Sequence, residues 1–399
     1  MTNVTYYSVL ISLLISLSGC VGKKDRHVLV STVGAEAESV YLTSDGENRP
    51  VIAWTENSNE GVKFFYARIS KSGNVKDKRI AIPVPADIST HAEGMPKVAF
   101  RSDGTVIAAY ETKTPTKENK YAGAIFFTES RDQGNTWSAP AYIHSDTIAG
   151  RSRSFFDLDR LSDGQVGAAW LDIKLKKSKG GSSIRFSRTM DGAGFVNEVL
   201  VDSSACECCR IDLYSNNDGS INISYRGMKK GIMGQFVRDI MHTVSKDNGA
   251  TFSEAQRLSA DNWIIDGCPH TGPSLCGANN SLHALWYSEG GSTGIFYSVS
   301  NGKNFSPRES VSFSGKHPQM TAIEDNLLLV WEESTGNGVE SSNRIRCQLR
   351  SGTNLTSSYL TPDGVDAFFP VVTTTEDKFL VAYLMKEKGT TGVYVHSFQ

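Results

Sequence analysis

The sequence predicts an all-β protein of the β-propeller class, and three observations support this prediction. A short β-branched run that ends in an aromatic residue recurs seven times along the 399 residues. Successive copies lie 45 to 61 residues apart, which is the length of a four-stranded propeller blade with long loops. Between the copies no stretch keeps the period of an amphipathic helix. Seven blades are therefore expected, with six as the alternative if the first and last copies build one irregular blade.

The seven copies share an apolar run closed by Trp or Tyr. They are residues 51–54, 106–110, 166–170, 221–225, 282–286, 327–331 and 379–383. Three of them follow an Asp-Gly dipeptide, which suits the tight turn of a β-hairpin. Each copy is therefore predicted to be the second strand of a hairpin. The last copy runs out after three strands, and we expect residues 27–32 to supply its fourth strand and to close the ring.

The N-terminus is not expected to join the ring. Residues 9–17 are apolar but too few to span a bilayer, and the run ends in Leu-Ser-Gly-Cys20. This pattern resembles a bacterial lipoprotein signal, although no Lys or Arg precedes the apolar run. The resemblance implies a signal peptide at 1–19, a lipidated tether at 20–26 that begins with Cys20, and a single propeller domain at 27–399. It further implies a bacterial envelope protein, with the outer membrane preferred, that meets the membrane through its lipid only; an anchor helix with an incidental cysteine is the alternative.

Charge composition excludes one class of partner. The chain has 41 basic and 43 acidic residues, for a formal net charge of −2, and no Lys/Arg cluster recurs on one face. Nucleic acid is therefore not an expected partner. An exported chain meets an oxidising compartment, so the six cysteines after Cys20 are expected to form disulfides or to bind metal.

Two segments share the spacing S-x-D-x-G-x-T-[WF], at residues 130–137 and 245–252. In such a turn the Ser and Asp side chains bond nearby backbone amides, Gly adopts a positive φ, and the aromatic ring packs between sheets. The segments resemble the Asp boxes, or BNR repeats, of the sialidase superfamily. The resemblance implies a sialidase-like propeller with each box between the third and fourth strands of a blade, away from the active site. The Phe-Arg-Ile-Pro-like segment of sialidases is absent; the nearest match is residues 67–70.

Chemistry-bearing residues recur at the loops that lead into first strands and at the ends of second strands. In a propeller these positions surround one end of the axis, which we call the mouth. The loops carry His91, Glu93, Arg151, Arg153, Cys206, Cys208, Cys209, Arg210, Asp266, Cys268, His270, Lys316, His317 and Asp366, and the strand ends carry Glu56, Glu111, Asp172, Arg226, Glu289 and Glu332. This convergence predicts a site at the mouth.

A metal site is the leading prediction for the mouth, because thiolates and an imidazole suit copper(I) or zinc. The predicted ligands are Cys206, Cys208, Cys209, Cys268 and His270. The alternatives are redox-active thiols, structural disulfides such as one from Cys268 to one of the other three, or inert buried cysteines. The segments 205–210 and 263–273 also resemble a group of bacterial exported, exo-sialidase-like BNR-repeat propellers, a resemblance that implies the fold.

Three functions follow from these patterns. The first is an envelope propeller whose mouth binds a transition metal or another small ligand. The second is a glycoside hydrolase of the exo-α-sialidase type acting on a glycan. Its expected catalytic residues are Glu56, Glu111, Asp172 and Glu332, as acid and as nucleophile or base, with Arg226 and Arg153 orienting the substrate. The third is a scaffold that binds another envelope protein.

Overall fold

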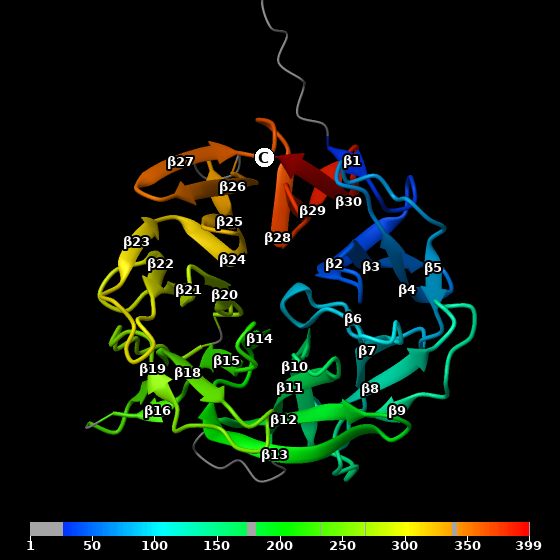
Figure 1. The fold of residues 1–399 in the computed structure, drawn as a ribbon, viewed down its shortest axis with the longest axis horizontal. Coiled ribbons are helices and arrows are strands. Elements are labelled where there is room, and N and C mark those ends of the chain that lie inside the picture. The colour runs from blue at the N-terminus through cyan, green and yellow to red at the C-terminus, as the bar shows by residue number, and fades with distance from the viewer. Residues whose placement is uncertain (1–26, 174–180, 232, 268, 337–340, 399) are drawn as a thin grey trace, which may run out of the picture.

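The computed structural model describes residues 27–173, 181–231, 233–267, 269–336 and 341–398. These residues form seven four-stranded antiparallel sheets arranged as blades around a central axis (Figure 1), so the predicted seven-bladed propeller is confirmed. The N-terminal segment that contains the predicted signal peptide and Cys20 lies outside the described residues. Within the described part of the chain, no helix has the length and apolar character needed to cross a membrane.

Blades 1 to 3 each use four consecutive strands. Blade 1 comprises β2 (Glu36–Ser44), β3 (Pro50–Ser58), β4 (Gly61–Arg68) and β5 (Ile80–Ile82). A 3-10 turn, η1 (Ala92–Gly94), precedes blade 2, which comprises β6 (Lys97–Phe100), β7 (Val106–Lys113), β8 (Gly123–Ser130) and β9 (Ala141–Tyr142). Blade 3 comprises β10 (Ser152–Arg160), β11 (Val166–Ile173), β12 (Ser182–Met190) and β13 (Gly194–Ala205).

Blade 4 carries a small extra hairpin between its second and third strands. The blade comprises β14 (Asp212–Ser215), β15 (Ile221–Arg226), β18 (Ile240–Ser245) and β19 (Gln256–Arg257), and the hairpin pairs β16 (Lys229–Lys230) with β17 (Phe236–Val237). Blade 5 comprises β20 (Ser274–Ala278), β21 (Ser281–Ser288), β22 (Gly294–Val299) and β23 (Glu309–Ser312). Blade 6 comprises β24 (Gly315–Ile323), β25 (Asn326–Thr335), β26 (Ser342–Ser351) and β27 (Asn354–Tyr359).

Blade 7 joins the two ends of the ring. It comprises β28 (Asp366–Thr374), β29 (Phe379–Glu387), β30 (Thr390–Phe398) and the N-terminal strand β1 (Val28–Leu29). Val28 pairs with Val395 and Leu29 with Tyr394, and Figure 1 shows the blue and red ends of the chain side by side. The predicted closure by the N-terminal strand is confirmed, although the regular strand is only two residues long.

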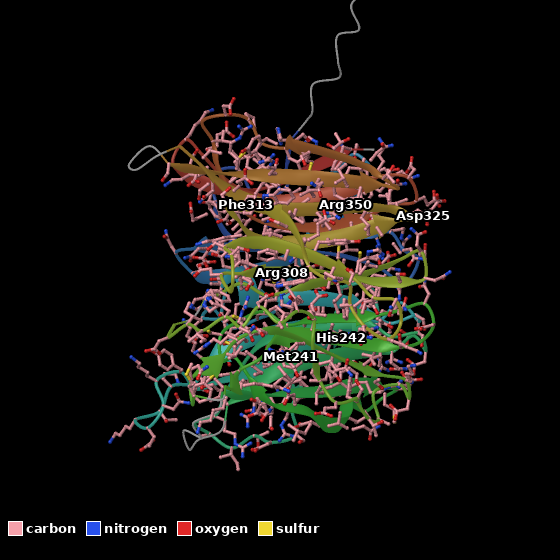
Figure 2. All side chains as sticks on the ribbon, turned by 90° about the vertical axis from the view of Figure 1, so that its left-hand side faces the viewer. Met241, His242, Arg308, Phe313, Asp325 and Arg350 are labelled. Atoms are coloured by element: carbon pink, nitrogen blue, oxygen red, sulfur yellow. The ribbon has the colours of Figure 1, made fainter. Side chains whose placement is uncertain are left out.

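The core lies between the blades, because each sheet buries both faces against its neighbours. All seven aromatic runs fall on second strands, as predicted. Four of their Trp residues are among the largest fully buried side chains, namely Trp54, Trp170, Trp286 and Trp331. Replacing a buried Trp by Ala costs about 3–5 kcal/mol. Figure 2 views the ring edge-on, with side chains of blades 4 to 6 toward the viewer.

The two S-x-D-x-G-x-T segments form the self-capped turns predicted for them. In the first, the carboxylate of Asp132 accepts from the amide of Thr136 at 2.8 Å and from its hydroxyl at 2.6 Å, and the Ser130 hydroxyl accepts from the amide of Gly134 at 2.7 Å. These hydrogen bonds, led by the one from the Thr136 hydroxyl, lower the pKa of Asp132 to about 2. The turn follows the third strand of blade 2, on the rim, so Asp132 has a structural role.

Candidate functional site

Loops that lead into blades 2, 4 and 5 meet at the mouth. The imidazoles of His91, before blade 2, and His270, before blade 5, lie with ring centroids 5.5 Å apart. Beneath them the Glu93 carboxylate accepts from the amide of Gly272 at 2.9 Å and lies 3.6 Å from Nε of Arg210. Burial, and then the charge of His270, lower the pKa of His91. The predicted convergence of the loops that lead into first strands is therefore seen among the described residues.

Arg210 connects these loops through hydrogen bonds to their backbone. Its Nη2 donates to the carbonyl oxygens of Gly272 and Pro273 at 3.2 Å and of Pro318 at 3.1 Å, and its side chain is almost fully buried. These bonds join blade 4 to the loops of blades 5 and 6. Because its guanidinium is committed to backbone oxygens, Arg210 sets the shape of the mouth and does not face a ligand.

Four bulky residues at the mouth hold a left-handed backbone. They are Phe155 (φ 51°), His270 (φ 49°), His317 (φ 49°) and Phe369 (φ 51°). Three of the four lie where the register of a first strand shifts, in β10, β24 and β28. Residues with side chains of this size rarely adopt a positive φ, and each such strain costs on the order of 1–3 kcal/mol. Strain repeated at the same end of three blades indicates a shaped site.

A His-carboxylate pair occupies one side of the mouth. Nδ1 of His317 lies 3.0 Å from Oε2 of Glu332, and the same oxygen accepts from the amide of Phe369 at 3.2 Å. Burial disfavours the charged imidazole, but the hydrogen bond with Glu332 and the charge of Glu93 outweigh it and raise the pKa of His317. The ring of Phe369 packs on the imidazole with centroids 4.6 Å apart.

Glu111 is a neutral acid on the other side of the mouth from the His317–Glu332 pair. It follows Tyr110 at the end of β7, is partly exposed, and accepts a hydrogen bond from the amide of Phe155. Burial raises its pKa to about 8, against the smaller effects of that amide and Lys113. Glu111 is therefore protonated near neutral pH and can donate a proton, as a general acid must.

The predicted second-strand residues fall into two groups by their distance from the aromatic residue that ends each run. Glu111, Arg226 and Glu332 stand one residue after the aromatic, and each holds backbone of the next blade, at Phe155, Thr271 and Phe369 respectively. Glu56 and Asp172 stand two residues after it. Because alternate side chains of a strand point to opposite faces, these two point to the other face of their sheets.

Glu56 and Asp172 are engaged in structural contacts. The Glu56 carboxylate accepts from the indole of Trp54 at 2.8 Å and from the amide of Thr32 at 2.7 Å, and Glu333 holds Trp331 in the same way at 2.8 Å. Asp172 is buried between Arg153 at 3.8 Å and Arg185 at 3.4 Å. The structure thus commits Glu56, Asp172 and Arg153 to structural contacts, of which the Asp172 pairs lie within blade 3. It leaves Glu111 and Glu332 as the predicted carboxylates among the mouth loops.

Arg226 supports the cysteine loop and does not project toward a ligand. It donates to the carbonyl oxygens of Arg238 at 3.0 Å, Thr271 at 3.1 Å and Tyr287 at 2.9 Å. Its guanidinium carbon lies 4.6 Å from the ring centroid of Trp263. The substrate-orienting role predicted for Arg226 is therefore not supported by these contacts.

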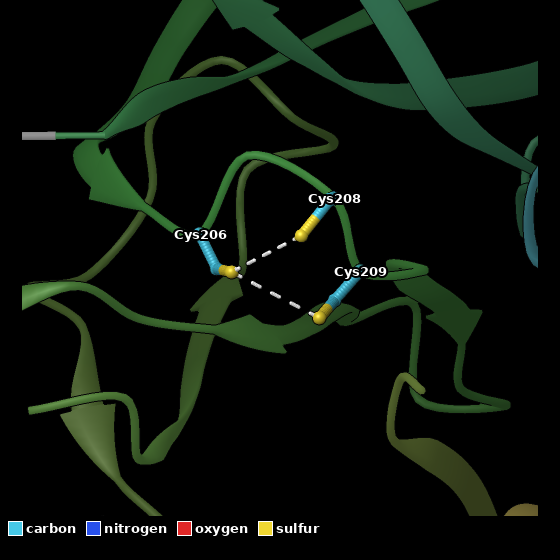
Figure 3. A group of neighbouring side chains, drawn as sticks. All are labelled: Cys206, Cys208 and Cys209. Atoms are coloured by element: carbon cyan, nitrogen blue, oxygen red, sulfur yellow. Dashed lines mark hydrogen bonds between the residues drawn. The ribbon is translucent and has the colours of Figure 1, made fainter. Parts of the chain in front are cut away.

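The cysteine loop joins β13 to β14 and brings three sulfurs together (Figure 3). The Sγ atoms of Cys206, Cys208 and Cys209 all lie within 4.8 Å of one another. Cys206 and Cys209 are free thiols, whereas Cys208 is disulfide-bonded. The hydrogen bond from Cys209, with the charges of Arg238 and Arg226, outweighs burial and lowers the pKa of Cys206 to about 6.

The sulfurs as arranged do not fit a metal ion bound by all three cysteines. The sulfur of Cys208 is not available as a thiolate while it is in a disulfide, and the Arg238 guanidinium, 2.9 Å from Sγ of Cys206, occupies the space of a cation. His270 faces His91 and is not part of the sulfur group, and Cys268 lies outside the described residues. A copper or zinc site stays a prediction for the reduced protein only.

Below the mouth, a cavity of about 590 Å³ follows the axis. Two acids that line it hold neighbouring strands: Asp157 accepts from the amide of Leu213 at 2.8 Å and Asp212 from that of Leu275 at 2.7 Å. The ammonium of Lys97 lies 3.3 Å from Asp157. Each acid bonds the first strand of the following blade, so this network fixes the blades around the axis.

Comparison with known proteins supports the fold. No protein-family model matches the chain, and no curated protein sequence matches it significantly. A solved PL25 ulvan lyase has a TM-score of 0.54 at 11% identity and covers 93% of this chain and 95% of its own. The intramolecular trans-sialidase of Ruminococcus gnavus has a TM-score of 0.51 at 10% identity, with 91% and 94% covered. A protein of unknown function from Dyadobacter fermentans has a TM-score of 0.52 at 17% identity, with 76% and 93% covered. The predicted sialidase-like propeller is confirmed, and identities this low show the fold alone.

Sequence reasoning missed the aromatic and backbone parts of the site. Phe155 and Phe369 flank the mouth, and nothing in their types predicted this. A Pro follows both His317 and Phe369, and a residue before Pro is restricted in its backbone, which is the one local signal at these bulges. Arg238 contacts Cys206, and it was not among the residues predicted for the site.

Proposed function

We propose that the protein is a glycan-active propeller that binds a carbohydrate at its mouth and cleaves it by proton transfer. The observation that carries the proposal is the convergence of five protonatable side chains at one end of the axis. They are His91, His270, His317, Glu111 and Glu332. Glycosidic bond cleavage needs a proton donor and a proton acceptor, and this set contains both.

In the proposed reaction the neutral carboxyl of Glu111 protonates the leaving oxygen. The Glu332 carboxylate lies 3.0 Å from Nδ1 of His317 and accepts a hydrogen bond from the amide of Phe369, so it is positioned for the role of base or nucleophile. The half-buried rings of Phe155 and Phe369 offer apolar surfaces against which a sugar ring packs. Lys113 and Lys316 are exposed nearby, and they favour a glycan that carries carboxylate or sulfate groups.

The structural comparisons support a carbohydrate ligand without choosing the reaction. Structures with TM-scores above 0.5 include one named a polysaccharide lyase and one named a trans-sialidase with oseltamivir carboxylate bound. The proposal includes an envelope location through a lipid on Cys20, where an exported protein meets extracellular glycans. Metal binding is not needed for this chemistry.

The test is a panel of anionic and neutral polysaccharides and an aryl sialoside. Hydrolysis releases reducing ends, and elimination releases an unsaturated product that absorbs ultraviolet light. We expect hydrolysis of an anionic glycan, with a loss of about 100-fold or more in kcat for Glu111→Gln and no change for the exposed control Glu118→Gln. Detection of the unsaturated product would show that the reaction is an elimination and not a hydrolysis. The absence of both binding and turnover across the panel would refute the proposal.

A further inference from the structure

The cysteine loop has a chemical arrangement that glycan cleavage does not use. Sγ of Cys206 lies 3.8 Å from Sγ of Cys208 and 3.9 Å from Sγ of Cys209. Figure 3 shows the sulfur of Cys206 joined by dashed lines to both of the other sulfurs. A free thiol is thus in contact with a sulfur of a disulfide and with a second free thiol.

The two free thiols differ in their surroundings. Cys206 receives a hydrogen bond from Nη1 of Arg238 at 2.9 Å and another from the thiol of Cys209. Cys209 is fully buried and packs with the other cysteines against Phe155. Negative charge is therefore favoured on Cys206. A thiolate next to a cation, spaced C-x-x-C from a buried thiol, is the arrangement that makes a cysteine nucleophilic.

We propose that Cys206 and Cys209 form a dithiol that exchanges internally with the disulfide of Cys208. In the first step the Cys206 thiolate attacks Sγ of Cys208; a Cys206–Cys208 bond forms, and the partner sulfur of Cys208 leaves as a thiolate. In the second step Cys209, after losing its proton, attacks Sγ of Cys206 and expels Cys208 as a thiolate. The products are a Cys206–Cys209 disulfide and two thiols.

The exchange balances without an outside oxidant. One disulfide and two thiols are present before and after it, and the two expelled thiolates take up the protons released by the attacking thiols. Both steps join sulfurs that are already in contact. The three side chains are 1%, 8% and 2% exposed in sequence order, so external thiols reach them poorly, and the neighbouring sulfur is the most accessible partner.

The exchange site also touches the mouth. Phe155 packs on the three cysteines and its ring lies 5.8 Å from that of His91 in an edge-on arrangement. A new bond between Cys206 and Cys209 pulls the loop together beneath Phe155. The redox state of the loop is therefore expected to change the position of Phe155 at the glycan site. The exchange itself does not depend on the proposed glycan activity.

The test maps disulfides in the folded protein. Samples are given limiting dithiothreitol, quenched with acid, alkylated and cleaved with trypsin, which yields residues 189–210 as one peptide that contains all three cysteines. We expect a fraction of this peptide to be no longer cross-linked to the disulfide partner of Cys208. In that fraction Cys208 should be alkylated, and Cys206 and Cys209 should be joined by a disulfide within the peptide. In Cys209→Ser the Cys206–Cys208 intermediate should accumulate.

The control is Cys347→Ser, because Cys347 is a buried free thiol on β26 outside the loop; it should exchange like the wild type. In Cys206→Ser the Cys208 disulfide should be reduced at least several-fold more slowly. The proposal is overturned if no disulfide that contains Cys206 forms in the wild type at any level of reductant. This last measurement uses the unaltered chain, so it stands even if a variant misfolds.

Discussion

Replacing Glu111 by Gln should make the stability of the ring less sensitive to pH. Burial raises the pKa of Glu111 from 4.5 to about 8 in the folded protein. Between these two values the folded state keeps a proton that the unfolded state has lost. The free energy of unfolding therefore falls as the pH rises through this window, and the loss is complete above about pH 8. A Gln side chain has no proton to lose.

The size of the effect follows from the difference in pKa. At about 1.4 kcal/mol for each pKa unit, the full difference corresponds to roughly 5 kcal/mol. Glu111 is partly exposed, so solvent screens the carboxylate and we expect about 2–3 kcal/mol. For a ring of this size 1 kcal/mol shifts Tm by about 1.3 °C, which gives a change of about 3–4 °C.

The assay is thermal unfolding of the wild type and Glu111→Gln between about pH 5 and pH 9 at fixed ionic strength. Relative to the variant, the wild type should lose about 3–4 °C across this range. The exposed control Glu118→Gln should follow the wild type at every pH. A difference between wild type and Glu111→Gln that is constant over the whole range would refute the assignment of a neutral Glu111.

Three further results are expected. Cys20→Ala should move the protein from the membrane to the soluble fraction on cell fractionation; membrane retention would contradict the lipid anchor. A chain that begins at Ala35 lacks β1, so it should melt less cooperatively or aggregate through the exposed edge of blade 7; unfolding like that of the mature chain would show that β1 is dispensable. Glu333→Gln should lower the free energy of unfolding by about 1–3 kcal/mol, since it weakens a buried acceptor for the Trp331 indole; an unchanged denaturant midpoint would count against that contact.

The sequence was sufficient for the fold because the fold is periodic. The aromatic at the end of each second strand fills the space between blades, so its recurrence reports the number of blades directly. The partner of the last blade was also predictable, because three strands at one end and one at the other leave a single way to close the ring.

The site was predictable only at the level of topology. Loop positions correctly placed His91 and His270 at one end, but Glu56 and Glu111 were treated alike. Their distance from the preceding aromatic separates them, and the two-residue period of a strand would have assigned them to opposite faces. The raised pKa of Glu111 depends on burial by another blade, which no local pattern reports.

Three side chains that directly follow the aromatic residue of a second strand make contacts with a consequence for protein engineering. Glu111 bonds the amide of Phe155, Arg226 the carbonyl of Thr271, and Glu332 the amide of Phe369, so each loop is held by a side chain of the blade before it. A mouth loop grafted alone into another propeller would arrive without the group that fixes its backbone. The unit that can be transferred is the loop together with the last residues of the second strand in the preceding blade. Redesign of binding specificity therefore has to change each loop together with the strand end that holds it.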